Sequence, residues 1–327
     1  MVVLYDKILP KIQEAFTYGG GINVFQIRKE VIEAVDLGAN GGNPSLVALR
    51  NELSSRADGW VNPEDFDQRS RFFETYCEAV FYLIATKRGI SIEPIPRSQE
   101  KTPDFKTTCT PHVHFEVKTL DISVPIINYP SDMRVGLEAN LKANEEAHQR
   151  GIGFATQEVS PHGSSKNWLA VVEQVLAKLD GNIKREQYTQ APTFLVADMS
   201  RTSIRVDRTE IVQEKLISAK DTFDAEAAHV SGQLWTIANH ASGSSFTWLD
   251  QDRRIANGKL FRAGVLCDHP YIQGIIFTQN PWSGFEQYTD WQDSYPLLGI
   301  WNENCSQKCS DDSRSKAKRV FDSICTT

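Results

Sequence analysis

The chain has 327 residues, of which 40% are hydrophobic and 24% are charged, and its formal net charge at pH 7 is −7. A chain of this length can bury one large or two ordinary cores, and its acidic balance argues against a protein that coats nucleic acid without specificity. No apolar run reaches the roughly 18 residues of a membrane-spanning helix, and the first residues lack the basic start of a secretory signal. We therefore expect a cytoplasmic protein that does not enter a membrane.

Residues 1–65 are expected to form a small N-terminal helical region. Apolar residues recur at helical spacing over residues 4–16 and 25–36, and a further short helix is expected over residues 44–53. The glycines at 19–21 are not followed by the Gly-Lys-Ser/Thr of a phosphate-binding loop, so they indicate a connection only. The sequence leaves the role of this region open between a DNA-contacting subdomain and a packing appendage.

The strongest helical pattern in the chain covers residues 70–87. Its central apolar stripe is made of Phe73, Cys77, Val80 and Ile84. Gly89 is expected to end the helix, because glycine adopts the backbone conformation that closes a helix C-terminus. Glu74 and Glu78 lie at the edge of the apolar stripe. Either carboxylate could therefore reach toward the strands that follow.

Three strands are expected after this helix, over residues 90–95, around residues 103–105 and over residues 113–120. Side chains alternate between the two faces of a strand. In the third strand, one face carries the core residues Val113, Phe115 and Val117, and the other carries His112, His114, Glu116 and Lys118. Asp104 adds a carboxylate from the strand before it. Two carboxylates and a lysine on one sheet face suit a divalent metal ion and the hydrolysis of a phosphodiester.

The dipeptide Pro103-Asp104, followed by the tripeptide Glu116-Val117-Lys118 inside an apolar strand, resembles the signature of the PD-(D/E)xK nuclease superfamily. The resemblance implies a restriction-endonuclease-like α/β fold, with a mixed central sheet flanked by helices. The expected order of one helix and three strands is the order that this fold requires. It also implies a metal-dependent nuclease that hydrolyses DNA phosphodiester bonds, and an endonuclease of restriction or defence type would suit the size of the chain.

Roles for individual residues follow from the resemblance. Asp104, Glu116 and the carbonyl of Val117 would hold Mg²⁺, or Mn²⁺ in its place. Lys118 would orient or deprotonate the attacking water, or stabilise the pentacovalent phosphate. The first core helix of this superfamily often adds an acidic residue to the metal site, and the spacing to the helix-ending glycine selects Glu78. A helical wheel instead brings Glu74 closer to the buried stripe, so the choice between them stays open.

The remaining chain is assigned to a nuclease-like core, residues 66–327, with an insertion over about residues 200–262. Further helices are expected over residues 135–150, 168–186, 206–216 and 222–239. Strands are expected over residues 193–197, 265–266 and 272–278. Asp198, at the end of the first of these, could be a further metal ligand or a cap.

Two alternatives concern function and partners. The fold could serve as a non-catalytic module for nucleic-acid binding or assembly, although the intact Asp104, Glu116 and Lys118 argue against a lost site. DNA is the expected partner, but nothing in the residues excludes RNA, and a homodimer is compatible with the sequence.

Two further patterns allow both a functional and a structural interpretation. His112 and His114 could contact a phosphate, act as an auxiliary base or bind a transition metal, or they could be structural. The six cysteines are too scattered for a disulfide framework. A zinc site at Cys305, Cys309 and Cys325 would need a fourth ligand that this segment lacks, so free thiols near a C-terminal helix are the simpler expectation.

Overall fold

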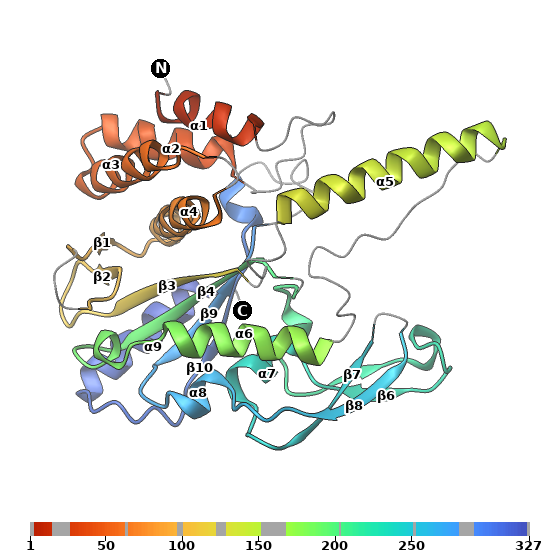
Figure 1. Ribbon diagram of the computed structural model, residues 1–327. Helices are drawn as coiled ribbons and strands as arrows, with labels where there is room; N and C mark the ends of the chain where they lie inside the picture. Colours follow the sequence, from red (N-terminus) through yellow and green to blue (C-terminus); the bar gives the residue numbers. More distant parts are fainter. Residues whose placement is uncertain are drawn as a thin grey trace.

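The computed structural model describes residues 3–14, 27–62, 65–96, 101–121, 129–151, 168–202, 204–250, 253–280 and 291–325. Its centre is a six-stranded mixed sheet with the strand order β1-β2-β3-β4-β9-β10 (Figure 1). These strands are Ile92–Pro94 (β1), Phe105–Thr107 (β2), His114–Asp121 (β3), Thr193–Arg201 (β4), Gly274–Thr278 (β9) and Leu297–Trp301 (β10). Strands β3, β4 and β9 are parallel, and antiparallel neighbours complete both sides of the sheet. The α/β class with a mixed central sheet flanked by helices is therefore confirmed.

The middle of the sheet is covered on both faces. In β4, Phe194 and Val196 enter one hydrophobic core, and Leu195 and Ala197 enter the other. An apolar run of this kind is typical of a parallel strand buried on both sides. The strands predicted over residues 193–197 and 272–278 are confirmed as β4 and β9, and β3 also lies inside the sheet.

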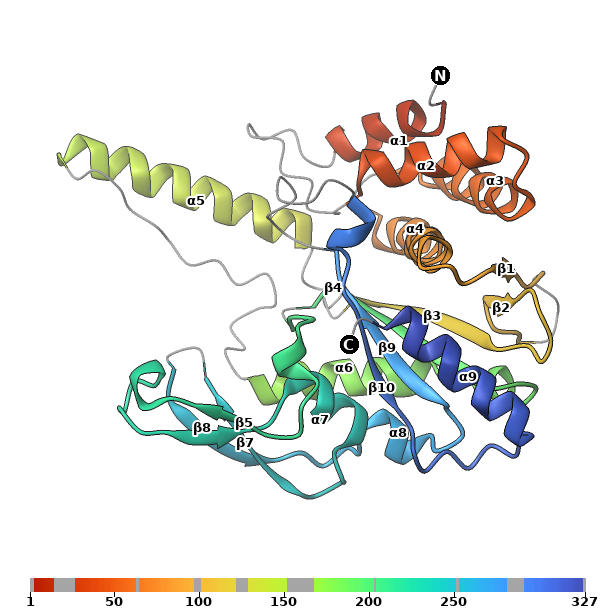
Figure 2. The ribbon, with the colours of Figure 1, turned by 180° about the vertical axis from the view of Figure 1, so that it is seen from behind.

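Helices at the N-terminal end of the chain cover one face of the sheet (Figures 1 and 2). They are Val3–Glu14 (α1), Lys29–Asn40 (α2), Pro44–Gly59 (α3) and Phe66–Lys87 (α4). Helix α4 lies on the sheet, where the ring of Phe81 is 5.3 Å from Phe115 and 6.0 Å from Phe105. Helices α1 to α3 share one hydrophobic core with α4, and Asp311–Ile324 (α9) contributes to the same core near β10.

The other face is covered by Trp168–Asn182 (α6), Gln233–Asn239 (α7) and Val265–Asp268 (α8). Helix Tyr129–Gln149 (α5) extends away from the sheet in both views (Figures 1 and 2). Helix α6 ends before the predicted boundary at residue 186, and a short 3-10 helix, Arg185–Tyr188, follows it. No helix in the described ranges is both long and apolar enough to cross a membrane.

Residues 200–262 differ from the prediction of two long helices. They form two small antiparallel pairs, and α7 is the only α-helix in the described part of this segment. The pairs are Lys215–Ile217 (β5) with Ala228–Val230 (β6), and Ser245–Leu249 (β7) with Ile255–Lys259 (β8). Gly232, directly before α7, lies so close to the chain at residue 212 that a Cβ on it would be 2.4 Å from the carbonyl oxygen of Val212. The strand predicted over residues 265–266 is also wrong, because these residues begin α8.

Candidate active site

Asp104 immediately precedes β2 and is held against β3. Its N–H donates to the carbonyl of Phe115 at 3.1 Å, and its own carbonyl accepts from Ile95 at 2.9 Å. The side chain turns the same way, because its Oδ2 accepts a hydrogen bond from the N–H of Val117 at 2.8 Å. The backbone of β3 therefore fixes the carboxylate of the preceding strand next to Glu116.

Glu116 lies in β3 on the face opposite Phe115 and Val117, and only 1% of its surface is exposed. Oε1 accepts from Nε2 of Gln187 at 2.6 Å and also contacts the ammonium group of Lys118. Oε2 is buried and has no hydrogen-bond partner among the described residues. A buried carboxylate oxygen without a partner is costly, so this atom is a candidate for a ligand that the protein itself does not supply.

Lys118 follows two residues later on the same face of β3, as the alternation of the strand predicts. Its side chain is about one-fifth exposed and forms an ion pair with Glu116. The structure thus brings Asp104, Glu116 and Lys118 together on two adjacent strands.

Glu78 reaches this region from α4, whereas Glu74 is exposed one turn earlier. Glu78 and Asp104 line the same cavity of about 490 Å³. Burial raises the pKa of Asp104 well above its usual range, and the charges of Glu78 and Glu116 raise it further. The structure therefore places Glu78 beside the strand carboxylates, in agreement with the spacing argument and against the helical wheel.

Several residues at the site have no motif that would single them out in the sequence. Gln187 and Tyr188 come from the short 3-10 helix before β4, and Glu52 comes from α3. Gln187 lines the cavity and bonds to Glu116, which is itself behind the cavity wall. Burial raises the pKa of Tyr188 strongly, and the charges of Glu116 and Asp104 add to this shift, so the phenol lies close to both carboxylates. These two neighbours lie four or more residues before β4 and offer no periodic pattern that would single them out.

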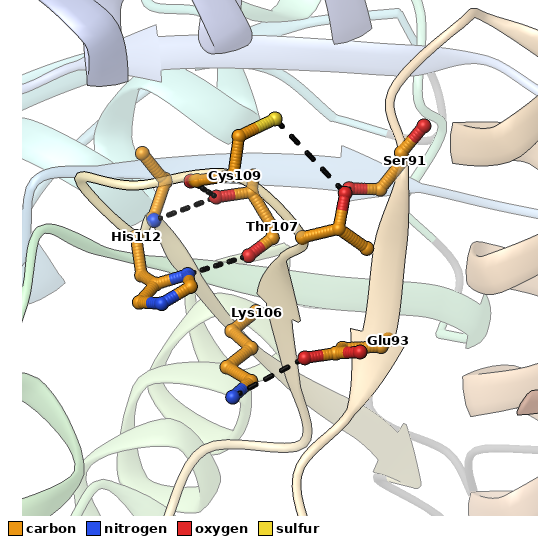
Figure 3. A network of polar contacts seen from close by, with 8 residues as sticks. Ser91, Glu93, Lys106, Thr107, Cys109 and His112 are labelled. Carbon is orange, nitrogen blue, oxygen red and sulfur yellow. Dashed lines mark hydrogen bonds and ion pairs between the residues drawn. The ribbon is translucent and has the colours of Figure 1, made fainter.

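His112 and His114 line a second cavity, of about 520 Å³, and not the one beside Asp104. His114 is buried, and its pKa is lowered to about 4 by burial and by the nearby charges of His112 and Lys106. Nδ1 of His112 donates to the carbonyl of Thr107 at 2.7 Å (Figure 3). The two histidines are therefore close together, but on a neighbouring part of the surface.

Other candidate ligands lie elsewhere. Asp198 is inside β4, not at its end, and its Oδ1 accepts from the N–H of Ser200 at 2.9 Å. Burial raises the pKa of Asp198, and the carboxyl group does not line the cavity beside Asp104. All six cysteines are free, and Cys325 is buried at the end of α9 beneath Gly299.

The fit of a metal ion depends on the carboxylates of Asp104, Glu116 and Glu78. Within the described ranges, no three His, Cys, Asp or Glu side chains already stand in the arrangement of a metal cluster. Two of the carboxylates are occupied by protein donors, namely the N–H of Val117 and the side chains of Gln187 and Lys118. Oε2 of Glu116 lacks a partner, and the pKa of Asp104 is raised by burial and then by the charges of Glu78 and Glu116. A divalent cation would supply the missing partner and offset the repulsion between these carboxylates. The carboxylate oxygens of these three residues are therefore of the ligand type that Mg²⁺ prefers.

No protein-family model matches this chain, and neither the curated proteins nor the solved structures include a significant match to it.

Proposed function

We propose that this protein is a metal-dependent nuclease that hydrolyses DNA phosphodiester bonds on a restriction-endonuclease-like core. The observation that carries the proposal is the meeting of Asp104, Glu116 and Lys118 on adjacent strands, with Glu78 approaching from α4. Acidic and basic groups in a covered part of a sheet are costly, and such arrangements are concentrated at functional sites.

The order of the elements also supports the proposal. Helix α4 is followed by β1, β2 and β3, and β4 then returns parallel to β3 after α5 and α6. This is the order that the PD-(D/E)xK resemblance requires around its two motif strands. The similarity in element order concerns the fold, and the function depends on the site residues.

Asp104, Glu116, the carbonyl of Val117 and Glu78 are the groups that would hold Mg²⁺, with Mn²⁺ as the alternative. Bound there, the ion would neutralise negative charge on the phosphate and lower the pKa of water. The N–H of Val117 orients the carboxylate of Asp104, and Nε2 of Gln187 orients that of Glu116. These bonds fix both acids before substrate arrives, which is the preorganisation that a hydrolytic site needs.

Lys118 is the positive group that pairs with Glu116. Hydrolysis adds a water oxygen to phosphorus and breaks one ester P–O bond, and negative charge develops on the phosphoryl oxygens and the leaving oxygen. An ammonium group beside Glu116 can stabilise that charge directly. Lys118 therefore acts as an electrostatic stabiliser in this proposal, and its loss should reduce turnover more than binding.

The decisive experiment incubates the purified protein with plasmid and linear DNA, and separately with RNA, in Mg²⁺, Mn²⁺ or EDTA. Wild type is expected to cleave DNA only with a divalent metal, and Lys118→Ala is expected to be inactive although folded. Lys220→Ala, which removes an exposed lysine in the inserted segment, serves as the matched control. Cleavage that persists in Lys118→Ala would overturn the role of this lysine. Binding of nucleic acid without any cleavage by the wild type would favour the non-catalytic module instead.

A further inference from the structure

The cavity beside Asp104 is adjacent to the second cavity, of about 520 Å³. The two cavities share Ile95, Thr102 and Pro103 in their linings. The second is enclosed by the β2–β3 hairpin, the segment before β4 and the residues that lead into α9. The two cavities therefore lie next to each other, on either side of the segment that carries Thr102 and Pro103.

The two cavities differ in their charged lining residues. The first is lined by three acidic residues, Glu52, Glu78 and Asp104, and by one basic residue, Lys101. The second is lined by Lys106, Lys308 and the two histidines, and its described lining includes no Asp or Glu. The second cavity thus lacks the acidic side chains of the first, and Lys308 is the basic group that it offers to an anion, because Lys106 is paired with Glu93.

His114 shows that this cavity has an unmet hydrogen-bonding group. Only 7% of its surface is exposed, and its Nδ1 is buried without a partner among the residues that the structure describes. Buried polar atoms are nearly always hydrogen-bonded, and an unpaired one costs free energy. His114 also lines the cavity, so the residue that carries this unpaired atom borders the space that a ligand would occupy.

The start of α9 forms the opposite wall. Ser310 caps this 14-residue helix by accepting a hydrogen bond from the N–H of Ser313, and both serines line the cavity. The N-terminus of a helix carries partial positive charge, which favours anions such as phosphate. The first turn of α9 also carries Asp311 and Asp312, which do not line this cavity. Lys308 precedes the cap and is exposed at the cavity edge.

The hairpin wall is held in place by two contacts seen in Figure 3. Lys106 forms an ion pair with Glu93 of β1 at 3.2 Å, and Nδ1 of His112 donates to the carbonyl of Thr107. These contacts fix Lys106 and the imidazole of His112 beside the buried ring of His114.

We propose that this second cavity binds a phosphate group of the nucleic acid strand, adjacent to the phosphodiester that is held at Asp104 and Glu116. The assignment rests on the proposed nuclease function for the identity of the strand. The binding of an anion by Lys308, His114 and the start of α9 is inferred from the cavity and does not depend on that function. The phosphate is either an internal diester of the strand or a terminal monoester at its 5′ end.

The first test titrates inorganic phosphate into the full-length protein in EDTA and follows binding by calorimetry. We expect Lys308→Ala to weaken binding roughly tenfold, the worth of one charge-assisted hydrogen bond. Lys220→Ala should bind as wild type does. Lys308 is exposed, so its replacement leaves the fold intact. Absence of phosphate binding by the wild type, or equal affinities of wild type and Lys308→Ala, would overturn the proposal.

The second test measures the affinity of single-stranded oligonucleotides with and without a 5′-phosphate, in the Lys118→Ala background with Mg²⁺ present. Lys308→Ala should lower the salt dependence of binding by about one unit of slope for the ligand that fills the cavity. A loss confined to the phosphorylated oligonucleotide assigns the cavity to a terminal phosphate, and an equal loss for both assigns it to an internal one. No change for either would refute the subsite. The wild-type protein could fail to cleave DNA while Lys308→Ala still loses phosphate binding. That result would refute the nuclease function and leave the phosphate site in place.

Discussion

The main-chain N–H of Val117 donates a hydrogen bond to Oδ2 of Asp104 at 2.8 Å, and this bond joins the two halves of the motif. Val117 lies between Glu116 and Lys118, so one stretch of β3 positions an acid from another strand with its backbone and presents two charged side chains of its own. Geometry at this site is therefore set by strand pairing, and substitutions that keep the hydrogen-bonding pattern should change chemistry without unfolding the protein.

Asp104→Asn is expected to abolish cleavage while leaving the protein as stable as wild type or more stable in EDTA. The amide oxygen can still accept from Val117, but one of three mutually repelling carboxylates is gone. Loss of a metal ligand should reduce turnover by about 100-fold or more, since the metal supplies several kcal/mol. Cleavage rates and thermal unfolding in EDTA check both expectations. A variant that loses stability together with activity would contradict the charge argument.

Magnesium itself should stabilise the folded protein. A ligand that binds only the native state adds about 2.7 kcal/mol at 100 times its dissociation constant. We expect Mg²⁺ to raise the Tm of wild type and to leave that of Glu116→Gln almost unchanged, because Oε2 of Glu116 is the oxygen left without a partner. Calcium and sodium chloride at matched ionic strength separate specific binding from general screening. An equal rise in both proteins would place the ion elsewhere.

Glu78→Gln and Glu74→Gln form a matched pair on α4. Both remove one carboxylate from the same helix, but only Glu78 lines the cavity with Asp104. Glu78→Gln should therefore lower the cleavage rate by roughly tenfold or more and shift the Mg²⁺ dependence to higher concentration, consistent with loss of a ligand-shell contact. Glu74→Gln should behave as wild type. Equal effects would show that position on the helix, and not access to the cavity, determines the result.

Much of this arrangement can be predicted from the sequence because it depends on local patterns. The alternation over residues 113–120 gives both the strand and the face that carries Glu116 and Lys118, and the glycine at 89 gives the end of α4. Gln187 and Tyr188 could not be found in this way. They reach the carboxylates only because the chain between α6 and β4 folds back against β3, and no periodicity encodes that contact.

Residues 222–239 show the opposite case, in which a local pattern is overridden. Apolar spacing over residues 222–239 suggests a helix, yet residues 228–230 form β6 and pair with β5. Gly232 lies between this strand and α7, at a point where the chain passes close to the carbonyl of Val212. Short apolar runs fit both periodicities, and packing against the rest of the chain decides between them.

Gln187→Ala tests the support of the buried acid. The amide of Gln187 donates to Oε1 of Glu116 at 2.6 Å, and the carboxylate would lose that donor in the variant. Hydrogen bonds to charged groups contribute about 1.5–3 kcal/mol, so urea unfolding should show a loss of that order. Gln213→Ala removes an exposed glutamine and should change the free energy of unfolding little. If Gln187→Ala lost no more unfolding free energy than Gln213→Ala, the ion pair with Lys118 would be enough to stabilise the buried carboxylate of Glu116.

Asp198→Asn tests a buried acid outside the proposed site. Burial raises the pKa of Asp198 in the folded protein, although hydrogen bonds from Ser200 act in the opposite direction. A raised pKa means that folding favours the protonated form. The stability this group contributes is therefore complete below the unfolded-state pKa and is lost as pH rises through the folded-state pKa.

The asparagine variant lacks that titration and keeps an acceptor for the N–H of Ser200. Its free energy of unfolding should gain on that of wild type as pH rises from 4 toward 8, by about 1.4 kcal/mol for each unit by which the pKa is raised. Chemical denaturation at several pH values measures the difference. Asp224→Asn replaces an exposed carboxylate and serves as the control. Its free energy of unfolding should stay close to that of wild type across the same pH range. If the gap between wild type and Asp198→Asn were constant with pH, Asp198 would have to be ionised in the folded protein as readily as in the unfolded chain.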